Sequence, residues 1–252
     1  MYGINLNSRE NLRYISESLT QLGFPELGQT ILDSARNTAD DPLAAVRLAL
    51  QHTATEKQAE RFERCLRLSK MGEPVYLSNL LTYKVRQLDV EYIQHLGELE
   101  FVEEKRNLII WGSPGTGKTW MAKALATRAC QRGYRTRWVT YPYLCRELMR
   151  LRTEDSRRFD ARLNYYSNFE LLCIDEFPNS DIEDKFIMQE FFNLRKLKNH
   201  STIVSGQSEP RNWDALFEVK SFAQSIRGRL LENACLLEMK GPDLRTYDPS
   251  RE

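Results

Sequence analysis

Long apolar runs, closely spaced cysteines and clustered histidines are all missing from this sequence of 252 residues. No run approaches the roughly 20 apolar residues that a membrane-spanning helix needs. The first ten residues lack the apolar stretch of a signal peptide. The net charge is only +1, so overall charge indicates no particular partner. We therefore expect a cytoplasmic protein that has no membrane partner.

The few cysteines and histidines exclude a disulfide framework and a zinc site of ordinary spacing. The five cysteines are odd in number, and no two of them lie within three residues of each other. Several stand inside apolar runs, which predicts reduced thiols in a protein core. The three histidines are scattered along the chain and support no metal cluster: His52, His95 and His200.

The first part of the chain has helical periodicity and no strand-like alternation. We interpret residues 1–70 as a small helical module that serves a partner or assembly. Pro25 opens a second helix there, and Pro42 opens a third. Thr53–Glu56 has the spacing of a capping box, which predicts a separate charged helix over Glu56–Lys70.

The rest of the chain divides by a change of pattern. Residues 71–104 are predicted to be a linker and a lead-in helix, the latter over Glu91–Glu104. An α/β domain is predicted over 105–245, and residues 246–252 form a C-terminal tail. The boundaries follow a break at Gly72 and the first apolar strand that comes after it.

Strands and helices alternate over 105–245, which predicts a parallel five-stranded sheet flanked by helices on both faces. The predicted strands are Leu108–Trp111, Thr136–Thr140, Leu171–Asp175, Thr202–Ser205 and Cys235–Met239. The predicted helices are Lys118–Gln131, Tyr143–Arg152, Ser156–Tyr166, Asp181–Lys198 and Phe222–Glu232.

A glycine-rich motif joins the first of these strands to the first helix. Its sequence, Gly-Ser-Pro-Gly-Thr-Gly-Lys-Thr, is a P-loop (Walker A) pattern in the required strand-to-helix position. Its backbone N–H groups and the helix N-terminus face nucleotide phosphates. We expect ATP to bind there, with Lys118 at the β/γ-phosphates and Thr119 on Mg²⁺. The candidate ligands are Gly112, Ser113, Pro114, Gly115, Thr116, Gly117, Lys118, Thr119 and Trp120.

Two carboxylates end the third strand and supply a Walker B pattern. Asp175 is predicted to hold Mg²⁺ through its water shell, and Glu176 to orient and polarise the attacking water. An acidic strand end without function is common by itself. Following the P-loop in the same domain, the pair favours hydrolysis of ATP over binding alone, with Lys118 and Glu176 as catalytic residues.

Five later residues are weaker candidates, and each of the three arginines among them is equally well interpreted as a solvated surface charge. Gln207, or Ser205 before it, follows the fourth strand beside the expected γ-phosphate. Arg227 and Arg229 lie on a late helix, from which a neighbouring subunit's phosphate could be reached. Arg245 follows the last strand.

With these residues together, the sequence resembles the AAA+ ATPases of the IstB/DnaC type, and within them the IstB-type helper ATPases of insertion-sequence transposition. The resemblance covers most of the chain. It rests on the P-loop, on Leu171–Glu176, on Arg227-Gly-Arg-Leu230 and on Lys240-Gly-Pro-Asp-Leu-Arg245. It implies a P-loop NTPase (AAA+/ASCE) fold, ATP and Mg²⁺ as cofactors, and ATP hydrolysis.

The resemblance also implies roles for the late residues. Arg229 would be an arginine finger acting in trans across a subunit interface, and Arg245 would be sensor-like. Two positions depart from the family pattern. Gln207 stands where Asn is usual, which predicts slow hydrolysis, and Gly228 stands where Asp usually precedes the finger, which predicts a less firmly oriented Arg229.

A basic segment follows the P-loop helix and is the candidate surface for duplex DNA. Between Lys123 and Arg162 the chain has eleven Lys/Arg and four Asp/Glu. Clustered arginines suit phosphate contacts that do not read sequence, although a solvated, partly neutralised helix is the plainer interpretation. If the helix is continuous, several arginines share one face. The candidates are Arg146, Arg150, Arg152, Arg157 and Arg158.

The resemblance implies a regulatory ATPase that forms a homo-oligomer, a ring or a spiral filament, on duplex DNA. It would select the target of transposition and recruit or stimulate a transposase or another transposition protein. A replicative helicase loader of the DnaC type is the alternative and predicts a preference for single strands. A P-loop kinase of small molecules is a third hypothesis, against which Glu176 and the lack of an acceptor site argue.

Overall fold

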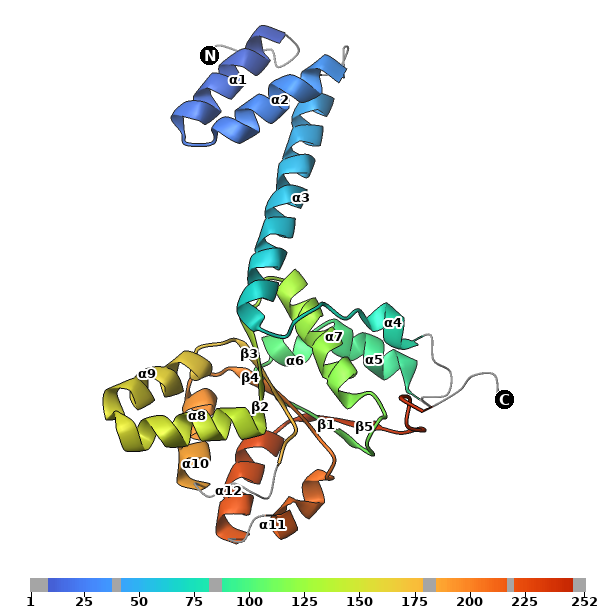
Figure 1. Ribbon diagram of the computed structural model, residues 1–252. Helices are drawn as coiled ribbons and strands as arrows, with labels where there is room; N and C mark the ends of the chain where they lie inside the picture. The colour runs from blue at the N-terminus through green and yellow to red at the C-terminus, as the bar shows by residue number, and fades with distance from the viewer. Residues whose placement is uncertain (1–8, 38–41, 82–87, 179–184, 217–219, 247–252) are drawn as a thin grey trace. The chain divides into compact units, whose positions relative to one another are not determined.

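The computed structural model describes residues 9–37, 42–81, 88–178, 185–216 and 220–246 (Figure 1). The chain forms two compact units, residues 1–63 and 64–252. The boundary between them falls inside a helix, whereas the sequence pattern placed the end of the helical module at residue 70.

The first unit is built from helices α1 (Arg9–Gln21), α2 (Pro25–Asn37) and the first part of α3 (Pro42–Ser69). Pro25 and Pro42 open their helices as expected, because proline is tolerated where no intrahelical N–H bond is needed. The apolar faces meet in a small core around Leu12, Ile31 and Ala49.

The prediction of a separate helix at Glu56 is wrong, because α3 runs without a break through the capping-box pattern. The hydroxyl of Thr53, the capping residue of that pattern, is buried and makes no hydrogen bond to any described residue, so it caps no helix. His52 and Glu56 lie 3.2 Å apart as an i,i+4 pair on the same helix. No glycine or proline interrupts this stretch, and a capping box alone does not end a helix.

The lead-in segment is also more divided than predicted. It contains α4 (Leu77–Leu81), α5 (Val90–Gly97) and α6 (Glu100–Glu103) in place of one helix over Glu91–Glu104. The break falls at Leu99, whose φ is 60° and whose side chain is buried. Packing of this leucine outweighs the cost of its left-handed backbone.

The second unit contains the five-stranded parallel sheet, which confirms the predicted fold class. The strand order is β2-β3-β4-β1-β5. The strands are β1 (Leu108–Gly112), β2 (Thr136–Thr140), β3 (Leu171–Asp175), β4 (Ser201–Gly206) and β5 (Cys235–Met239). All pairs are parallel, so every carboxyl end lies at one edge of the sheet.

Helices cover both faces of this sheet (Figure 1). Helix α7 (Lys118–Gln131) packs across one face and contacts four of the strands. On the other face lie α8 (Tyr141–Glu154), α9 (Ser156–Ser167), α10 (Lys185–Leu197) and α12 (Lys220–Leu231). A 3-10 turn (Pro210–Asn212) and α11 (Trp213–Leu216) precede α12. The predicted start of α10 at Asp181 lies outside the described residues.

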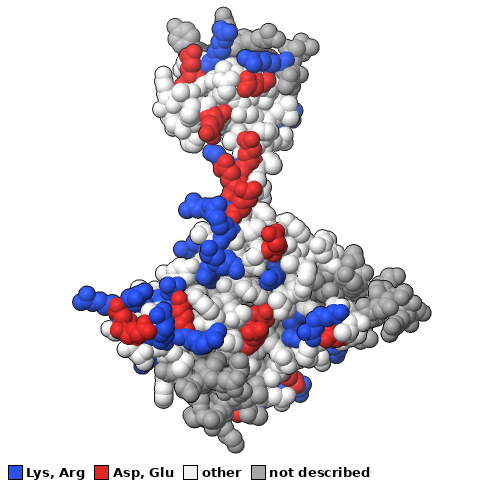
Figure 2. Space-filling view, in the orientation of Figure 1, with Lys and Arg blue, Asp and Glu red and all other residues white. Residues whose placement is uncertain are grey.

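The face of the second unit seen in Figure 2 carries acidic and basic side chains together, and the net charge of the whole chain is +1. Among the described helices, none combines the length and the apolar character that crossing a membrane requires.

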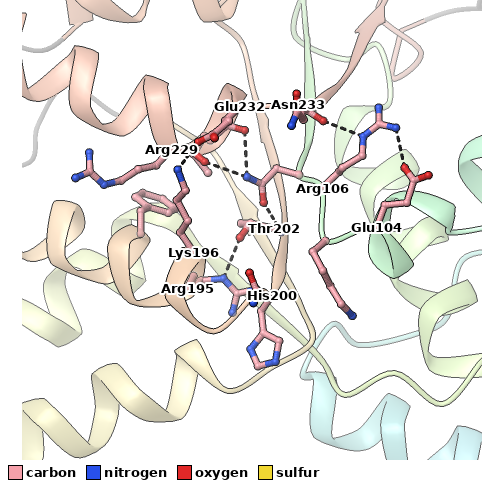
Figure 3. Close-up of a pocket in the computed structure, with 14 residues that line it drawn as sticks. Glu104, Arg106, Arg195, Lys196, His200, Thr202, Arg229, Glu232 and Asn233 are labelled. Carbon is pink, nitrogen blue, oxygen red and sulfur yellow. Dashed lines mark hydrogen bonds and ion pairs between the residues drawn. The ribbon is translucent and has the colours of Figure 1, made fainter.

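Polar side chains hold the amino ends of the strands together (Figure 3). The Asn107 amide donates to the carbonyls of Arg229 and Leu230, and its oxygen accepts the Thr202 amide at 2.9 Å. The Arg195 guanidinium is fully buried and donates to the Thr202 hydroxyl at 2.9 Å. Burial lowers the pKa of Arg195 to about 9, so it remains charged near neutral pH. This edge of the sheet is therefore fixed by buried hydrogen bonds.

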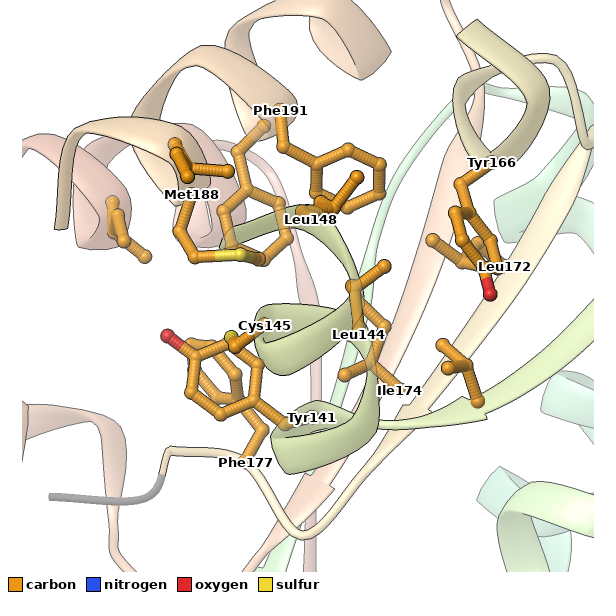
Figure 4. Close-up of a cluster of buried hydrophobic side chains, with 14 of the residues drawn as sticks. Tyr141, Leu144, Cys145, Leu148, Tyr166, Leu172, Ile174, Phe177, Met188 and Phe191 are labelled. Atoms are coloured by element: carbon orange, nitrogen blue, oxygen red, sulfur yellow. The ribbon is translucent and has the colours of Figure 1, made fainter. Parts of the chain in front are cut away.

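The main core lies between the sheet and helices α8, α9, α10 and α12 (Figure 4). Phe177 is at its centre and packs edge-on against Tyr141 and Trp213, with ring centroids 4.7 and 4.9 Å away. Of the cysteines, Cys145 and Cys173 are buried there or beside it, and burial raises the pKa of the Cys145 thiol to about 12. These are core thiols, as predicted.

Candidate nucleotide site

The phosphate loop begins where β1 ends and finishes at the first turn of α7. Gly115 and Gly117 have φ of 76° and 93°, which side chains rarely adopt, and these values turn the loop toward the helix N-terminus. The Lys118 ammonium donates to the Ser113 carbonyl at 2.7 Å, and so does the Thr116 hydroxyl at 2.9 Å. The loop is thus closed on itself, with the lysine amine folded over it.

The electrostatic setting of Lys118 suits an anionic ligand. Burial lowers the pKa of its ammonium, Asp175 opposes that shift, and the charge of Arg245 lowers the pKa further. A desolvated ammonium beside a second cation gains from any anion that comes between them. Phosphate oxygens of a nucleotide are such anions.

Asp175 connects the loop to the neighbouring strands. Its Oδ2 accepts the Thr119 hydroxyl at 2.9 Å, and its Oδ1 accepts the Ser205 hydroxyl at 2.5 Å. The amide of Glu176 also donates to Oδ1, at 3.0 Å. The structure therefore brings together Thr119 and Asp175, the two predicted metal ligands, although they are 56 residues apart in sequence.

Ser205 was considered as the alternative to Gln207 for sensing the γ-phosphate. In the structure its hydroxyl is buried and donates to Asp175. The strand order explains this, because β4 lies beside β3 and its last residues face the end of that strand.

The oxygen ligands at this edge fit Mg²⁺. A hydroxyl and a carboxylate, 2.9 Å apart, are hard oxygen donors of the kind that Mg²⁺ takes alongside water and nucleotide phosphates. Thr119 and Asp175 are the residues that would hold the ion. Among the described residues, no group of three or more His, Cys, Asp or Glu could hold a metal ion. Water and nucleotide phosphates would complete the coordination of an ion held by Thr119 and Asp175.

Glu176 projects from the site in an unusual backbone conformation. Its φ is 62°, and its side chain is exposed directly after the buried β3. The next residue, Phe177, donates its amide to the Ser205 carbonyl at 2.9 Å, which holds the turn against β4. Positive φ is costly for a glutamate and persists only where the surroundings enforce it.

Gly206 is one of the residues that enforce the backbone conformation of Glu176. A Cβ at this position would lie 1.5 Å from the carbonyl oxygen of Phe177, so β4 and the turn after β3 can approach only because the side chain is absent. The position and backbone of Glu176 therefore depend on a glycine that contributes no chemical group.

We expect Gly206→Ala to destabilise the protein by about 1–3 kcal/mol, because the methyl group forces the two chain segments apart. ATP hydrolysis should fall along with stability, since Glu176 moves with Phe177. Denaturant unfolding and a phosphate-release assay measure the two effects.

Gly228→Ala is the matched control, because a Cβ there meets no atom within 4 Å. An alanine inside α12 should raise stability by about 0.5–1 kcal/mol. Equal effects of the two substitutions would contradict the assigned role of Gly206.

The remaining predicted nucleotide ligands lie at the same edge. Gln207 is exposed and follows Gly206, whose partner in β1 is Trp111, one residue before the loop. Ser113 and Pro114 are exposed in the loop, and Trp120 is 56% exposed on the first turn of α7. Strand order places Gln207 between the loop and Asp175, where a γ-phosphate is expected.

The segment after β5 also reaches the loop. The Leu244 amide donates to the Gly115 carbonyl at 3.1 Å, and Arg245 is paired with Asp243 at 2.5 Å. The sequence pattern identified Arg245 and passed over Asp243. The signal was present, since an acidic residue stands two positions before the arginine in Gly-Pro-Asp-Leu-Arg.

Arg229 lies at the amino-terminal ends of the strands, opposite the carboxyl ends where the phosphate loop lies. Its backbone carbonyl accepts from Asn107, which directly precedes β1, whereas the phosphate loop follows β1. Its guanidinium donates to the Asn193 side chain on α10, and to the Ser225 carbonyl at 2.6 Å. The Arg229 guanidinium is thus held by groups of its own unit, and the expected effect of Gly228 on its orientation toward a neighbour stays a prediction.

The five candidate DNA arginines are all exposed, but not on one continuous helix. α8 ends at Glu154, and Asp155 caps α9 by accepting the amides of Arg157 and Arg158 at 3.0 and 3.1 Å. Arg150 pairs with Glu154 at 3.1 Å, and Arg152 with Glu190 at 3.6 Å. The prediction that several of these arginines share one helical face required a continuous helix, and the structure has two helices instead. Arg146, Arg150 and Arg152 belong to one helix and Arg157 and Arg158 to the next.

The comparison with protein families decides the identity of the chain. The family model described as "IstB-like ATP binding protein" matches residues 18–251. The chain belongs to the IstB-like ATP binding proteins. Similar proteins include an insertion sequence ATP-binding protein of Sinorhizobium fredii, 27% identical over 90% of this chain and 92% of that protein. The IS232 ATP-binding protein of Bacillus thuringiensis is 23% identical over 95% and 97%.

Solved structures confirm the fold of this IstB-like protein. DnaI superposes with a TM-score of 0.56 at 20% identity, covering 66% of this chain and 91% of DnaI. AMPPCP-bound DnaA from Aquifex aeolicus superposes with a TM-score of 0.55 at 21% identity, covering 68% and 51%. The DnaC helicase loader gives a TM-score of 0.51 at 20% identity, covering 70% and 99%. ATP binding by this chain follows from its family and its phosphate loop.

Proposed function

We propose that this IstB-like protein is an ATP-hydrolysing helper of DNA transposition. It oligomerises on duplex DNA, selects the target and recruits or stimulates the transposase. Its family and the insertion-sequence names of its relatives support the transposition role. The observation that carries the assembly is the placement of Arg229 at the edge of the sheet opposite the phosphate loop.

Hydrolysis rests on the carboxyl ends of β1, β3 and β4. Lys118 holds the β/γ-phosphates, and exposed Glu176 orients water and accepts its proton. Mg²⁺, held by Thr119 and Asp175, would neutralise charge on the phosphates. The Ser205 hydroxyl fixes the Asp175 carboxylate, and Gln207 bonds the γ-phosphate or the water.

The geometry of Arg229 supports the proposed assembly. The five residues of β1 span about 15 Å at the usual strand rise, which separates Arg229 from the phosphates of its own subunit. In the proposed oligomer a second copy supplies the arginine finger. ATP then binds the assembled state more tightly than the separate subunits and shifts the population toward the oligomer.

The first unit is the proposed surface for the transposase or another partner. Its core is small, and several large apolar side chains stay exposed on it: Tyr14, Leu22, Phe24, Leu43, Leu48 and Leu50. These exposed apolar side chains are the proposed contact with the partner.

Binding to DNA with an ATP analogue tests the proposal. We expect tight binding to duplex, weak binding without nucleotide, and electron micrographs that show a ring or spiral around the DNA. A preference for single strands would favour the helicase-loader alternative. Persistent monomers with nucleotide and duplex would overturn the proposal.

Replacing Arg150, Arg157 and Arg158 together with alanine should weaken duplex binding and flatten its salt dependence. Loss of three phosphate contacts lowers the slope of log K against log salt by about 2–3. The control removes three exposed arginines elsewhere, each paired with a carboxylate: Arg36, Arg135 and Arg211. An unchanged slope in the first variant would exclude α8 and α9 as the DNA surface.

A further inference from the structure

The segment Gly241–Thr246, which follows β5, packs on the phosphate loop at a point where the loop has no side chain. A Cβ built on Gly115 would lie 1.9 Å from the Asp243 Oδ1. The adjacent Leu244 amide donates to the Gly115 carbonyl at 3.1 Å. The carboxylate of Asp243 is therefore in direct contact with a loop that binds polyanions, which is an unfavourable place for an uncompensated negative charge.

The positive charge of Arg245 compensates the negative charge of the Asp243 carboxylate. Asp243 Oδ1 accepts the Arg245 amide at 3.0 Å and its Nε at 2.9 Å, and Oδ2 accepts Nη2 at 2.5 Å. These hydrogen bonds hold the pKa of Asp243 at about 2, so the carboxylate is charged at any working pH. The two side-chain bonds occupy one edge of the guanidinium and leave the Nη1 edge for other acceptors.

The arginine held in this way follows Leu244, which is bonded to the phosphate loop that contains Lys118. Burial lowers the pKa of the Lys118 ammonium, and the charge of Arg245 lowers it further, while Asp175 opposes the shift. Two cations near each other, one on the phosphate loop and one on the segment packed against it, repel unless an anion is shared between them. Phosphate oxygens of ATP would satisfy both.

We propose that Asp243 is a positioning residue of the nucleotide site, which orients the Arg245 guanidinium toward the ATP phosphates and braces Gly115 of the phosphate loop. The inference rests on ATP binding and on the proposed contact of Arg245 with phosphate. The Arg245 side chain is 69% exposed, so without this grip it samples many rotamers and loses entropy when ATP binds. Pairing with Asp243 restricts the Arg245 side chain before ATP binds, so less conformational entropy is lost on binding.

The test is a double-mutant cycle on ATP affinity, measured by calorimetry with the full chain and no DNA. Asp243→Asn keeps the size of the side chain and its packing on Gly115, and it removes the charged pair. We expect Asp243→Asn and Arg245→Gln each to weaken ATP binding by about 10-fold, and the double variant to be no weaker than Arg245→Gln alone. Glu238→Gln breaks the nearby exposed pair with Lys240 and should leave affinity unchanged.

Two outcomes would overturn the inference. Tighter or unaltered ATP binding by Asp243→Asn would show that the carboxylate is only a repulsive surface charge. Independent effects that multiply in the double variant would show that Asp243 does not act through Arg245. Because the assay contains neither DNA nor transposase, it gives the same answer whether or not the transposition role holds.

Discussion

Glu176→Gln should retain ATP binding and lose hydrolysis by about 10²- to 10⁴-fold, the usual contribution of a positioned general base. The amide has nearly the same shape as the carboxylate but cannot accept the proton of the attacking water. Glu176 is exposed and is not a hydrogen-bond partner of Asp175 through its side chain, so the backbone contacts that shape the turn remain. The rate of phosphate release should therefore fall while the nucleotide affinity stays the same.

Glu170→Gln is the control for this variant, because it makes the same chemical change at the amino end of β3. Glu170 accepts the Arg135 amide at 2.9 Å and is remote from the phosphate loop. Its rate should match the unmodified protein. A Glu176→Gln variant that hydrolyses ATP at the normal rate would remove the proposed base and leave the family role as nucleotide binding alone.

Arg229→Ala should lower hydrolysis by about 10³-fold or more, the range found for arginine fingers. The loss should be seen only under conditions in which subunits assemble, since Arg229 cannot reach the phosphates of its own chain. Arg227→Ala is the control on the same helix, because Arg227 pairs with Asp214 within the unit at 3.0 Å.

A mixing experiment identifies the finger as acting in trans. Lys118→Ala and Arg229→Ala are each expected to be inactive. Mixed oligomers contain interfaces in which one subunit supplies an intact Lys118 and its neighbour supplies an intact Arg229, so activity should partly return. No recovery, in mixtures shown to co-assemble, would contradict catalysis across an interface.

The Arg229 hydrogen bonds add a condition to this mechanism. The guanidinium is bonded to Asn193 and Ser225 within its own subunit. An arginine finger therefore has to exchange these partners for phosphate when subunits meet.

Local patterns were sufficient wherever the chemistry is contiguous in sequence. The glycines and Lys118 of the phosphate loop, with the strand before it and the helix after it, define a phosphate site without any long-range information. The limits of α7, β2, β3 and β5 agree with the sequence prediction, because buried strands and helices with clear ends carry strong periodicity.

Patterns failed at two helix boundaries. The capping box at Thr53 lies inside a continuous helix, because no glycine or proline stops α3 there. The lead-in helix ends at Gly97, and Leu99 then takes a left-handed backbone that the burial of its side chain stabilises.

The phosphate loop and the pair of carboxylates at a strand end could be predicted without a structure, since each depends on adjacent residues. How the two features meet depends on the packing of the whole domain. Strand order placed Ser205 on Asp175, the absent side chain of Gly206 allowed the Glu176 turn, and the segment after β5 brought Asp243 to Gly115. Sheet topology also put Arg229 at the far edge. The reason is physical: contacts between residues distant in sequence depend on which elements pack together, and no local pattern encodes that choice.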